Sequence, residues 1–344
     1  MRDSSGSVLG SAVSGAAIVT LAMKPDAPRV VRWALWACTS LGTAVAANQL
    51  AGKPVPFLRW SVLRMMLGQR RLFKEWQVGD GREKALATHV VTHARRGDLD
   101  DVIRVIDDFC YHRSFMMNIG DEKGEILDRA VQRTQPHRLL ELGTYCGYSA
   151  LRTIRAMPSD AHLYSIEFSP ANADIARRIW DHAGVGDRVT VVVGYLGDGG
   201  STLDRLQTEH GFTDGSLDLV FVDHDKAAYL PDVQHMLRHG WLHPGSVVVA
   251  DNVKYPGAPE YRAYMTEQEG KSWRTTEHRT HLEYQSLFTD LVLESEYLGG
   301  WMQSVPLNVE NLSAALGSVP GSGGEATGGG HSPSRRRLTR RPGV

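Results

Sequence analysis

Short apolar runs alternate with helix-length segments through the second half of the chain. Each run has five to seven residues and is rich in Val, Ile and Leu. Strands of a parallel sheet are buried on both faces and read as continuous apolar runs, so this pattern predicts an α/β fold. The five runs are residues 138–142, 162–167, 188–193, 217–223 and 246–251, and two further candidate strands lie at 273–277 and 290–298.

The segment before the first run is charged and amphipathic. Apolar residues recur at three- and four-residue spacing over 82–96 and 98–113, which predicts two helices. This texture begins near Gly79, where we place the start of the folded domain.

Two stretches near the N-terminus carry no charged residue. They span residues 4–23 and 33–52 and are 20 residues long each, which approaches the length of a membrane-spanning helix. Ser and Gly dilute the first stretch, and Asn48 and Gln49 interrupt the second. Two interpretations stay open. One is membrane association through residues 4–52, as one or two helices or an interfacial anchor, and the other is a targeting or flexible leader.

Charge and composition divide the rest of the chain into segments. Basic residues follow the second stretch, and they would hold the downstream domain on the cytosolic side if that stretch inserts. Removal of a leader would instead leave a cytoplasmic or organellar protein. The predicted segments are a leader and possible anchor at 1–53, a basic linker at 54–78, the folded domain at 79–300 and an extension at 301–344, Gly/Ser/Pro-rich and disordered from about 317.

The overall composition excludes several classes of protein. With 42% apolar and 22% charged residues, most of the chain is neither disordered nor collagen-like. The net charge is −1, although the last 28 residues carry five arginines, and we expect no nucleic-acid partner. Cys38, Cys110 and Cys146 are far apart, which favours a reducing compartment over a disulfide framework. Nothing in the sequence fixes the oligomeric state.

A turn with two glycines follows the first apolar run. In LLELGTYCGYS, Gly143 and Gly147 link a strand to a helix, where parallel sheets bind ligands. A dinucleotide fingerprint would have glycine at Tyr145. Glu141 would repel a phosphate but attract a sulfonium cation, and Glu167 ends the next run, where a carboxylate can bind a ribose. The turn therefore favours S-adenosylmethionine over NAD.

Two carboxylates and an amide stand at the ends of two later runs. Asp223 ends one run, and Asp251 and Asn252 end the next. Because neighbouring strands end in the same crevice, these side chains would offer hard oxygen ligands, which suit Mg²⁺. Lys226 lies three residues beyond Asp223, close enough to the predicted metal to act as a general base.

Six segments carry a resemblance to a known family. They are MNIGDEKGEILD (117–128), LLELGTYCGYSALR (139–152), AGVGDRVTVVVG (183–194), DLVFVDHDKAAYLPD (218–232), ADNVKYPGAPEY (250–261) and HLEY (281–284). On these segments, the chain from about Arg82 to Gly299 resembles the cation- and S-adenosylmethionine-dependent catechol O-methyltransferases, including their membrane-anchored and transmembrane relatives. The resemblance implies a Rossmann-like, doubly wound, seven-stranded sheet with a reversed last strand, preceded by helices that cover the cofactor.

The resemblance also implies roles for individual residues. Mg²⁺ would be held by Asp223, Asp251 and Asn252; Lys226 would be the base, and Glu283 would bind the second catechol hydroxyl. The implied cofactor contacts are Met117 and Ile119 on the methionine side, Gly143, Tyr145 and Ser149 at the turn, Glu167 at the ribose and His224 near the adenine. The implied catechol contacts are Asn252, Glu283, Phe115 and Pro256.

Several positions depart from the family pattern. Phe115 and Asp225 stand where the family has tryptophan, and Leu196-Gly197 replaces a Ser-Gln pair that contacts adenine. With Asp225, the run DHDK resembles DADK of the caffeoyl-CoA O-methyltransferases. The expected activity is Mg²⁺-dependent methylation of one catechol hydroxyl. The alternatives are methylation of another vicinal diphenol of the caffeoyl type, and a non-catalytic, membrane-tethered binding or trafficking protein on the same fold.

Overall fold

The computed structural model describes residues 29–49, 61–62, 80–284 and 288–300. The predictions for residues 4–23, for the extension at 301–344 and for all but two residues of the linker at 54–78 lie outside these residues. The folded domain and the N-terminal helix are described separately below.

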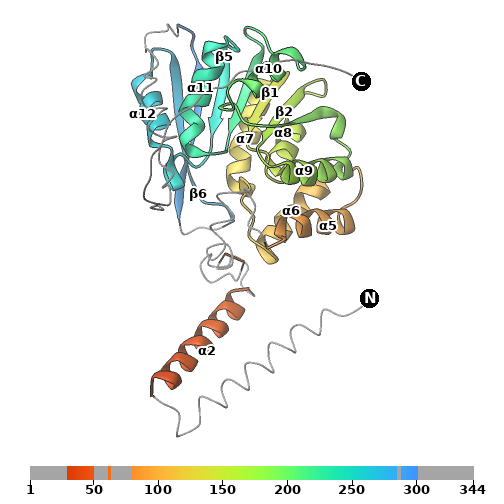
Figure 1. Ribbon diagram of the computed structural model, residues 1–344, viewed down its shortest axis with the longest axis vertical. Coiled ribbons are helices and arrows are strands. Elements are labelled where there is room, and N and C mark those ends of the chain that lie inside the picture. The colour runs from red at the N-terminus through yellow and green to blue at the C-terminus, as the bar shows by residue number, and fades with distance from the viewer. Residues whose placement is uncertain (1–28, 50–60, 63–79, 285–287, 301–344) are drawn as a thin grey trace, which may run out of the picture. The chain divides into compact units, whose positions relative to one another are not determined.

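The folded domain is built on one seven-stranded sheet with the strand order β3-β2-β1-β4-β5-β7-β6 (Figure 1). Strands β1 to β5 run parallel, whereas β7 is antiparallel to both of its neighbours, β5 and β6. The predicted seven-stranded α/β sheet with a reversed last strand is therefore confirmed. The strands are β1 Arg138–Leu142, β2 His162–Glu167, β3 Val189–Val193, β4 Leu217–Val222, β5 Leu242–Ala250, β6 Trp273–His281 and β7 Thr289–Tyr297.

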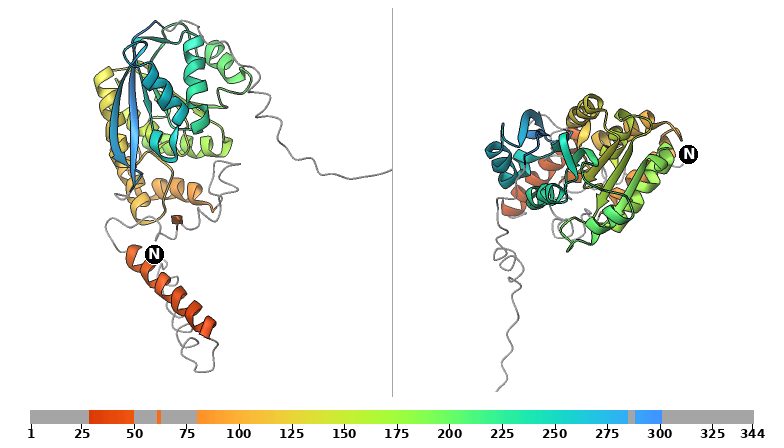
Figure 2. Two further views of the ribbon diagram at one scale, coloured as in Figure 1. Left: turned by 90° about the vertical axis from the view of Figure 1, so that its left-hand side faces the viewer. Right: turned by 90° about the horizontal axis from the view of Figure 1, so that it is seen from above.

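Helices cover both faces of this sheet, as the views in Figure 2 show. Successive residues of a strand point to opposite faces, so Leu139 packs into the core beneath α7, α8 and α9, and Leu140 into the core beneath α10, α11 and α12. Both leucines are fully buried, which explains the uninterrupted apolar runs in the sequence. The helices are α5 Arg82–His93, α6 Leu99–His112, α7 Gly120–Thr134, α8 Tyr148–Ala156, α9 Pro170–Ala183, α10 Ser201–Thr208, α11 Tyr229–Arg238 and α12 Pro259–Glu267.

Shorter helical turns join several of these elements, at η2 Gly186–Arg188, η3 Lys226–Ala228 and η4 Val253–Gly257. The predicted amphipathic helices before the sheet are α5 and α6, which pack against α9 and α8 respectively. In α6, the N-cap Asp98 accepts a hydrogen bond from the Asp101 backbone N–H at 3.0 Å, so one free amide of the first turn is satisfied.

Helix α2, Arg29–Gln49, covers most of the second uncharged stretch of the sequence. Its residues Arg29–Asn48 are long and apolar enough to cross a membrane. Trp33 is 76% exposed and Trp36 is 53% exposed. Large apolar side chains therefore stand on the surface of this helix.

Candidate active site

The strand register brings the predicted metal-binding carboxylates to one edge of the sheet. The backbone N–H of Asp223 donates to Leu142 O at 2.9 Å, at the end of β1. The backbone N–H of Asp251 donates to Val222 O at 3.0 Å, at the end of β4. Both carboxylates therefore follow neighbouring parallel strands at their carboxyl ends, where the sequence places them.

Lys226 lies in this edge beside the first carboxylate. Its Nζ donates to Asp223 Oδ1 at 2.9 Å and to the hydroxyl of Tyr229 at 2.5 Å. The Tyr229 hydroxyl in turn donates to the backbone carbonyl of Asp251 at 2.9 Å. Tyr229 thus links the predicted base to the strand end that carries the second carboxylate, a contact that sequence reasoning missed.

Asn252 connects the predicted metal ligands to the predicted substrate residue Glu283. Its backbone is left-handed, with φ of 54°, a conformation that asparagine tolerates better than most residues. Its side-chain amide donates to Glu283 Oε1 at 3.1 Å and to Asp290 Oδ2 at 2.8 Å. Glu283 lies between β6 and β7, so the reversed strand and its connection complete the site.

A buried lysine stands at the centre of these carboxylates. Lys123 Nζ lies 2.8 Å from Asp251 Oδ1 and 3.3 Å from Asp290 Oδ2, and it also pairs with Glu283. Burial alone would lower the pKa of Lys123, but the carboxylates, Asp251 first among them, raise it above its usual range. Sequence reasoning assigned no role to Lys123 or Asp290. The one available signal was the position of Lys123 inside the quoted segment at 117–128.

The second carboxylate has the chemistry of a cation ligand. The Asp251 side chain is 0% exposed, and burial raises its pKa to about 7, with Asp223 adding to this rise and Lys123 opposing it. Its Oδ2 is buried and has no hydrogen-bond partner within the described part of the chain. A buried, unpartnered carboxylate oxygen fits a hard cation such as Mg²⁺.

The predicted metal ligands are two carboxylates and one amide rather than a cluster of acidic or sulfur ligands. Within the described ranges, no group of three or more His, Cys, Asp or Glu side chains is arranged to hold a metal ion. Magnesium binding therefore stays a prediction that rests on Asp223, Asp251 and Asn252.

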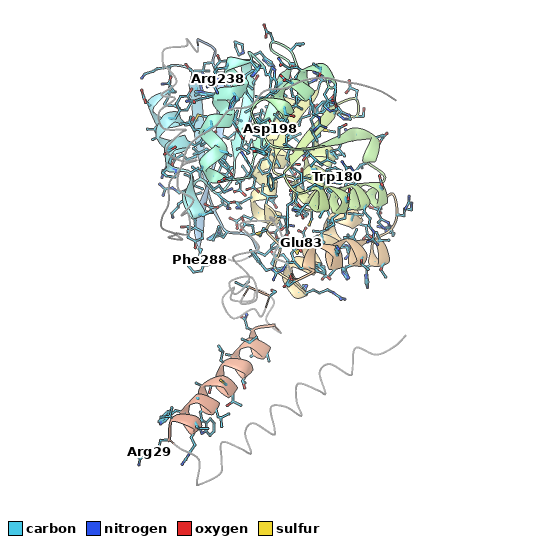
Figure 3. All side chains as sticks on the ribbon, viewed as in Figure 1. Arg29, Glu83, Trp180, Asp198, Arg238 and Phe288 are labelled. Atoms are coloured by element: carbon cyan, nitrogen blue, oxygen red, sulfur yellow. The ribbon has the colours of Figure 1, made fainter. Side chains whose placement is uncertain are left out.

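The glycine turn after β1 lies against the same edge. Gly143 has a φ of 102°, and a Cβ there would come within 2.2 Å of the Asp223 carbonyl oxygen. Only glycine therefore allows the turn to approach β4 so closely. The Tyr145 backbone N–H donates to Glu167 Oε2 at 2.7 Å, and its hydroxyl donates to Glu83 at 3.0 Å. Glu83 belongs to α5 and is labelled near the lower end of the folded domain in Figure 3. Helix α5 thus contacts the predicted cofactor turn.

Two buried carboxylates flank this turn. Ser149 Oγ donates to Glu141 Oε1 at 2.5 Å, and Ser165 donates to the other oxygen of Glu141. Burial raises the pKa of Glu141 to about 7. Burial also raises the pKa of Glu167, and hydrogen bonds from the backbone N–H groups of Ser169 and Tyr145 oppose this rise. Carboxylates at a turn suit a cofactor with a cationic sulfonium and a ribose better than one with phosphates.

The remaining predicted residues surround this edge. Ile119 is buried and precedes the first residue of α7, and Met117 is half-buried in the irregular segment before it. The backbone carbonyl of Phe115 in the same segment accepts a hydrogen bond from Arg82 Nη1 at 2.6 Å. His224 Nε2 contacts Asp232 at 2.8 Å. Pro256 is exposed in η4, next to the segment that holds Asn252.

The structure supports the predicted roles of these site residues to different extents. Direct contacts join Lys226 to Asp223, and they join Asn252 to Asp251 and Glu283. Tyr229 links the two groups. The structure places Gly143, Tyr145, Ser149 and Glu167 around one turn. The side chains of Phe115, Met117 and Pro256 are apolar and make no hydrogen bond to the acidic residues, so their roles stay predictions.

Known proteins similar to this chain identify its family. Residues 98–273 match the O-methyltransferase family. The chain belongs to that family. The protein is 62% identical to a probable O-methyltransferase of Mycobacterium tuberculosis (strain ATCC 25618 / H37Rv), over 68% of this chain and 100% of that protein.

The chain is also similar in sequence to catechol O-methyltransferases. It is 44% identical to catechol O-methyltransferase B of Danio rerio, over 59% of this chain and 74% of that protein. A crystal structure of an O-methyltransferase from Bacillus cereus in complex with SAH is 22% identical and has a TM-score of 0.45, covering 62% of this chain and 97% of that one. The sequence identity to catechol O-methyltransferases places this O-methyltransferase in the catechol O-methyltransferase-like group that the sequence motifs indicate.

Proposed function

We propose that this O-methyltransferase transfers a methyl group from S-adenosylmethionine to one hydroxyl of a catechol in a Mg²⁺-dependent reaction. The observation that carries the proposal is the contact of 3.1 Å between Asn252, a predicted metal ligand, and Glu283, the predicted catechol ligand. This contact means that the predicted metal site and the predicted diphenol site are adjacent. A catechol fits such an arrangement, because one of its two vicinal hydroxyls can reach the metal while the other reaches Glu283. The relationship to catechol O-methyltransferases supports the same acceptor class.

The proposed roles follow from the positions of the residues. Asp223, Asp251 and Asn252 would hold Mg²⁺, and Gly143, Tyr145, Ser149, Glu167, Met117, Ile119 and His224 would surround the cofactor. When bound, Mg²⁺ would lower the pKa of the catechol hydroxyls, and S-adenosylmethionine would supply the methyl group.

Two side chains of the protein would act on the acceptor itself. The neutral amine form of Lys226, held at the edge by Asp223, would take the proton of the reacting hydroxyl on Nζ. Glu283 would accept a hydrogen bond from the other hydroxyl and so orient the ring, while Phe115 and Pro256 would line its sides. Because an oxyanion meets a sulfonium cation, the main task of these residues is to position the reactants and exclude water.

The proposal is tested by incubating the full-length protein with S-adenosylmethionine and dihydroxybenzoate, and detecting the mono-methylated product by mass. Monohydroxybenzoate is the matched control, and it should give no product because it cannot span both sites. Caffeoyl-CoA, added in competition, tests the alternative acceptor that the DHDK run suggests. Preferred methylation of caffeoyl-CoA would shift the substrate to that class, and no product from either diphenol would contradict the proposed activity.

We also propose that α2 anchors the protein to a membrane, with the folded domain on the cytosolic side. The support is the exposed apolar surface of α2 and its length, together with the basic residues that follow the second uncharged stretch. No nucleic-acid partner is part of this proposal.

A further inference from the structure

The acidic edge is the end of the sheet where Asp223, Asp251, Glu283 and Asp290 gather, and Lys123 is the more deeply buried of its two lysines. Its side chain is 1% exposed and projects from the first turn of α7. A buried ammonium destabilises a fold unless carboxylates or other acceptors compensate it. Here Asp251, Asp290 and Glu283 all contact its Nζ, so α7 places a fixed positive charge inside the site.

Asp290 is the buried carboxylate that holds Lys123 in position. Its side chain is 0% exposed and lies at the start of β7. Oδ2 contacts Lys123 and accepts a hydrogen bond from Asn252 Nδ2 at 2.8 Å, and Oδ1 accepts one from the Tyr255 backbone N–H at 3.0 Å. Asp290 therefore fixes the ammonium of Lys123 relative to the segment after β5.

The charges at this edge do not cancel. The described cluster contains four carboxylates and two ammonium groups, which leaves two negative charges when all are ionised. The six groups belong to Asp223, Asp251, Glu283 and Asp290 and to Lys123 and Lys226. Such an excess favours a divalent cation, and the buried Oδ2 of Asp251 is the oxygen that Lys123 leaves open.

The position of Glu283 depends on the same lysine. Its carboxylate lies beside Asn252 together with Asp290, and like charges this close repel each other in a buried setting. The ammonium of Lys123 contacts both carboxylates and offsets that repulsion. Without it, Glu283 would turn toward solvent, because its side chain is already 13% exposed.

We propose that Lys123, held in place by Asp290, is a positioning residue that fixes Glu283 and Asp251 for the catechol and its cation. This inference rests on the proposed function and adds two residues to it. Lys123 does not touch the reacting atoms; it acts through the two carboxylates that it contacts.

The test measures binding rather than turnover. Full-length protein is saturated with S-adenosylhomocysteine, which carries no methyl group to transfer, and Mg²⁺ is added. Nitrocatechol is then titrated, because its absorbance reports binding. In Lys123→Met, we expect nitrocatechol to bind about tenfold or more weakly, while the affinity for S-adenosylhomocysteine stays within about twofold of wild type. A purely structural role would weaken both ligands together.

Lys254→Met is the matched control. Lys254 Nζ donates to Thr289 Oγ1 at 2.6 Å in an exposed contact near the same edge. This variant also loses one positive charge close to the site, but it should bind nitrocatechol as the wild type does. An equal loss in both variants would show a general effect of charge and overturn the role assigned to Lys123.

The other outcomes are equally distinct. Wild-type affinity for nitrocatechol in a Lys123→Met protein that binds S-adenosylhomocysteine overturns the inference alone. A wild-type protein that binds S-adenosylhomocysteine but not nitrocatechol overturns both the inference and the catechol proposal. If Lys123→Met does not fold, Asp290→Asn takes its place, and it should weaken nitrocatechol binding selectively because it releases Lys123 and Asn252. Unchanged binding there overturns the inference.

Discussion

At the residue scale, Glu141 shows how burial sets the chemistry of a side chain beside the cofactor turn. It is 1% exposed and accepts hydrogen bonds from the hydroxyls of Ser149 and Ser165. Burial raises its pKa from 4.5 to about 7, because two neutral hydroxyls compensate a buried negative charge only in part. The carboxyl that the sequence suggests for attracting a sulfonium is therefore held at a cost to the fold.

This cost makes the stability of the protein depend on pH. The folded state binds the Glu141 proton more tightly than the unfolded state, so stability falls as pH rises from 4.5 to about 7 and is constant above that range. Glu141→Gln should remove this component, which amounts to about 3 kcal/mol at most. Urea unfolding near pH 5 and near pH 8 measures it.

Glu125→Gln is the control for this prediction, because Glu125 is an exposed carboxylate on α7 paired with Arg129 at 3.5 Å. The control should lose as much stability between the two pH values as the wild type does. If Glu141→Gln also follows the wild type, Glu141 does not carry a raised pKa in the folded protein.

At the element scale, the candidate site combines residues from the ends of two strands, from one helix and from the connection between β6 and β7. Strands β4 and β5 supply Asp223 and Asp251, α7 supplies Lys123, and the connection between β6 and β7 supplies Glu283. Figure 3 shows Glu83 and Phe288 toward one end of the folded domain and Arg238, which ends α11 before β5 begins, toward the other. The acidic edge lies at the carboxyl ends of the parallel strands, as is usual for ligand sites in open α/β sheets.

Helix α2 is the element whose removal tests membrane attachment. The full chain should sediment with membranes and resist extraction at alkaline pH, because the 20 residues Arg29–Asn48 form a helix long and apolar enough to cross a membrane. A chain that lacks residues 1–52 should remain in the supernatant. Extraction of the full chain by high salt alone would indicate a peripheral, electrostatic attachment and contradict insertion.

At the scale of the whole molecule, the sequence predicts the parallel half of the sheet well and its reversed half less well. Strands β1, β2 and β4 are largely buried on both faces, β3 is partly buried, and all four read as apolar runs close to their observed bounds. Strand β5 begins at Leu242, earlier than the predicted 246, because Pro244 and Gly245 interrupt the run. Strand β6 continues to His281 through polar residues, since it lies at the edge of the sheet and has one exposed face.

The residues of the candidate site also differ in how well the sequence predicts them. Asp223, Asp251 and Asn252 are predictable because each stands directly after an apolar run. Lys123 and Asp290 are not, because their burial depends on a contact between residues 167 positions apart. In the sequence, Lys123 lies within the charged run DEKGE and reads as a surface residue. Charge patterns alone do not show which charges a tertiary fold will bury.

The central claim is that the acidic edge binds a divalent cation that the methyl transfer requires. The most direct measurement is the amount of methylated dihydroxybenzoate formed as Mg²⁺ is titrated into metal-free protein, for the wild type and for Asp251→Ala. We predict a saturable rise for the wild type that a chelator abolishes, and no product from the variant at any Mg²⁺ concentration, although both proteins bind S-adenosylhomocysteine. Normal product from Asp251→Ala without added metal would contradict the account.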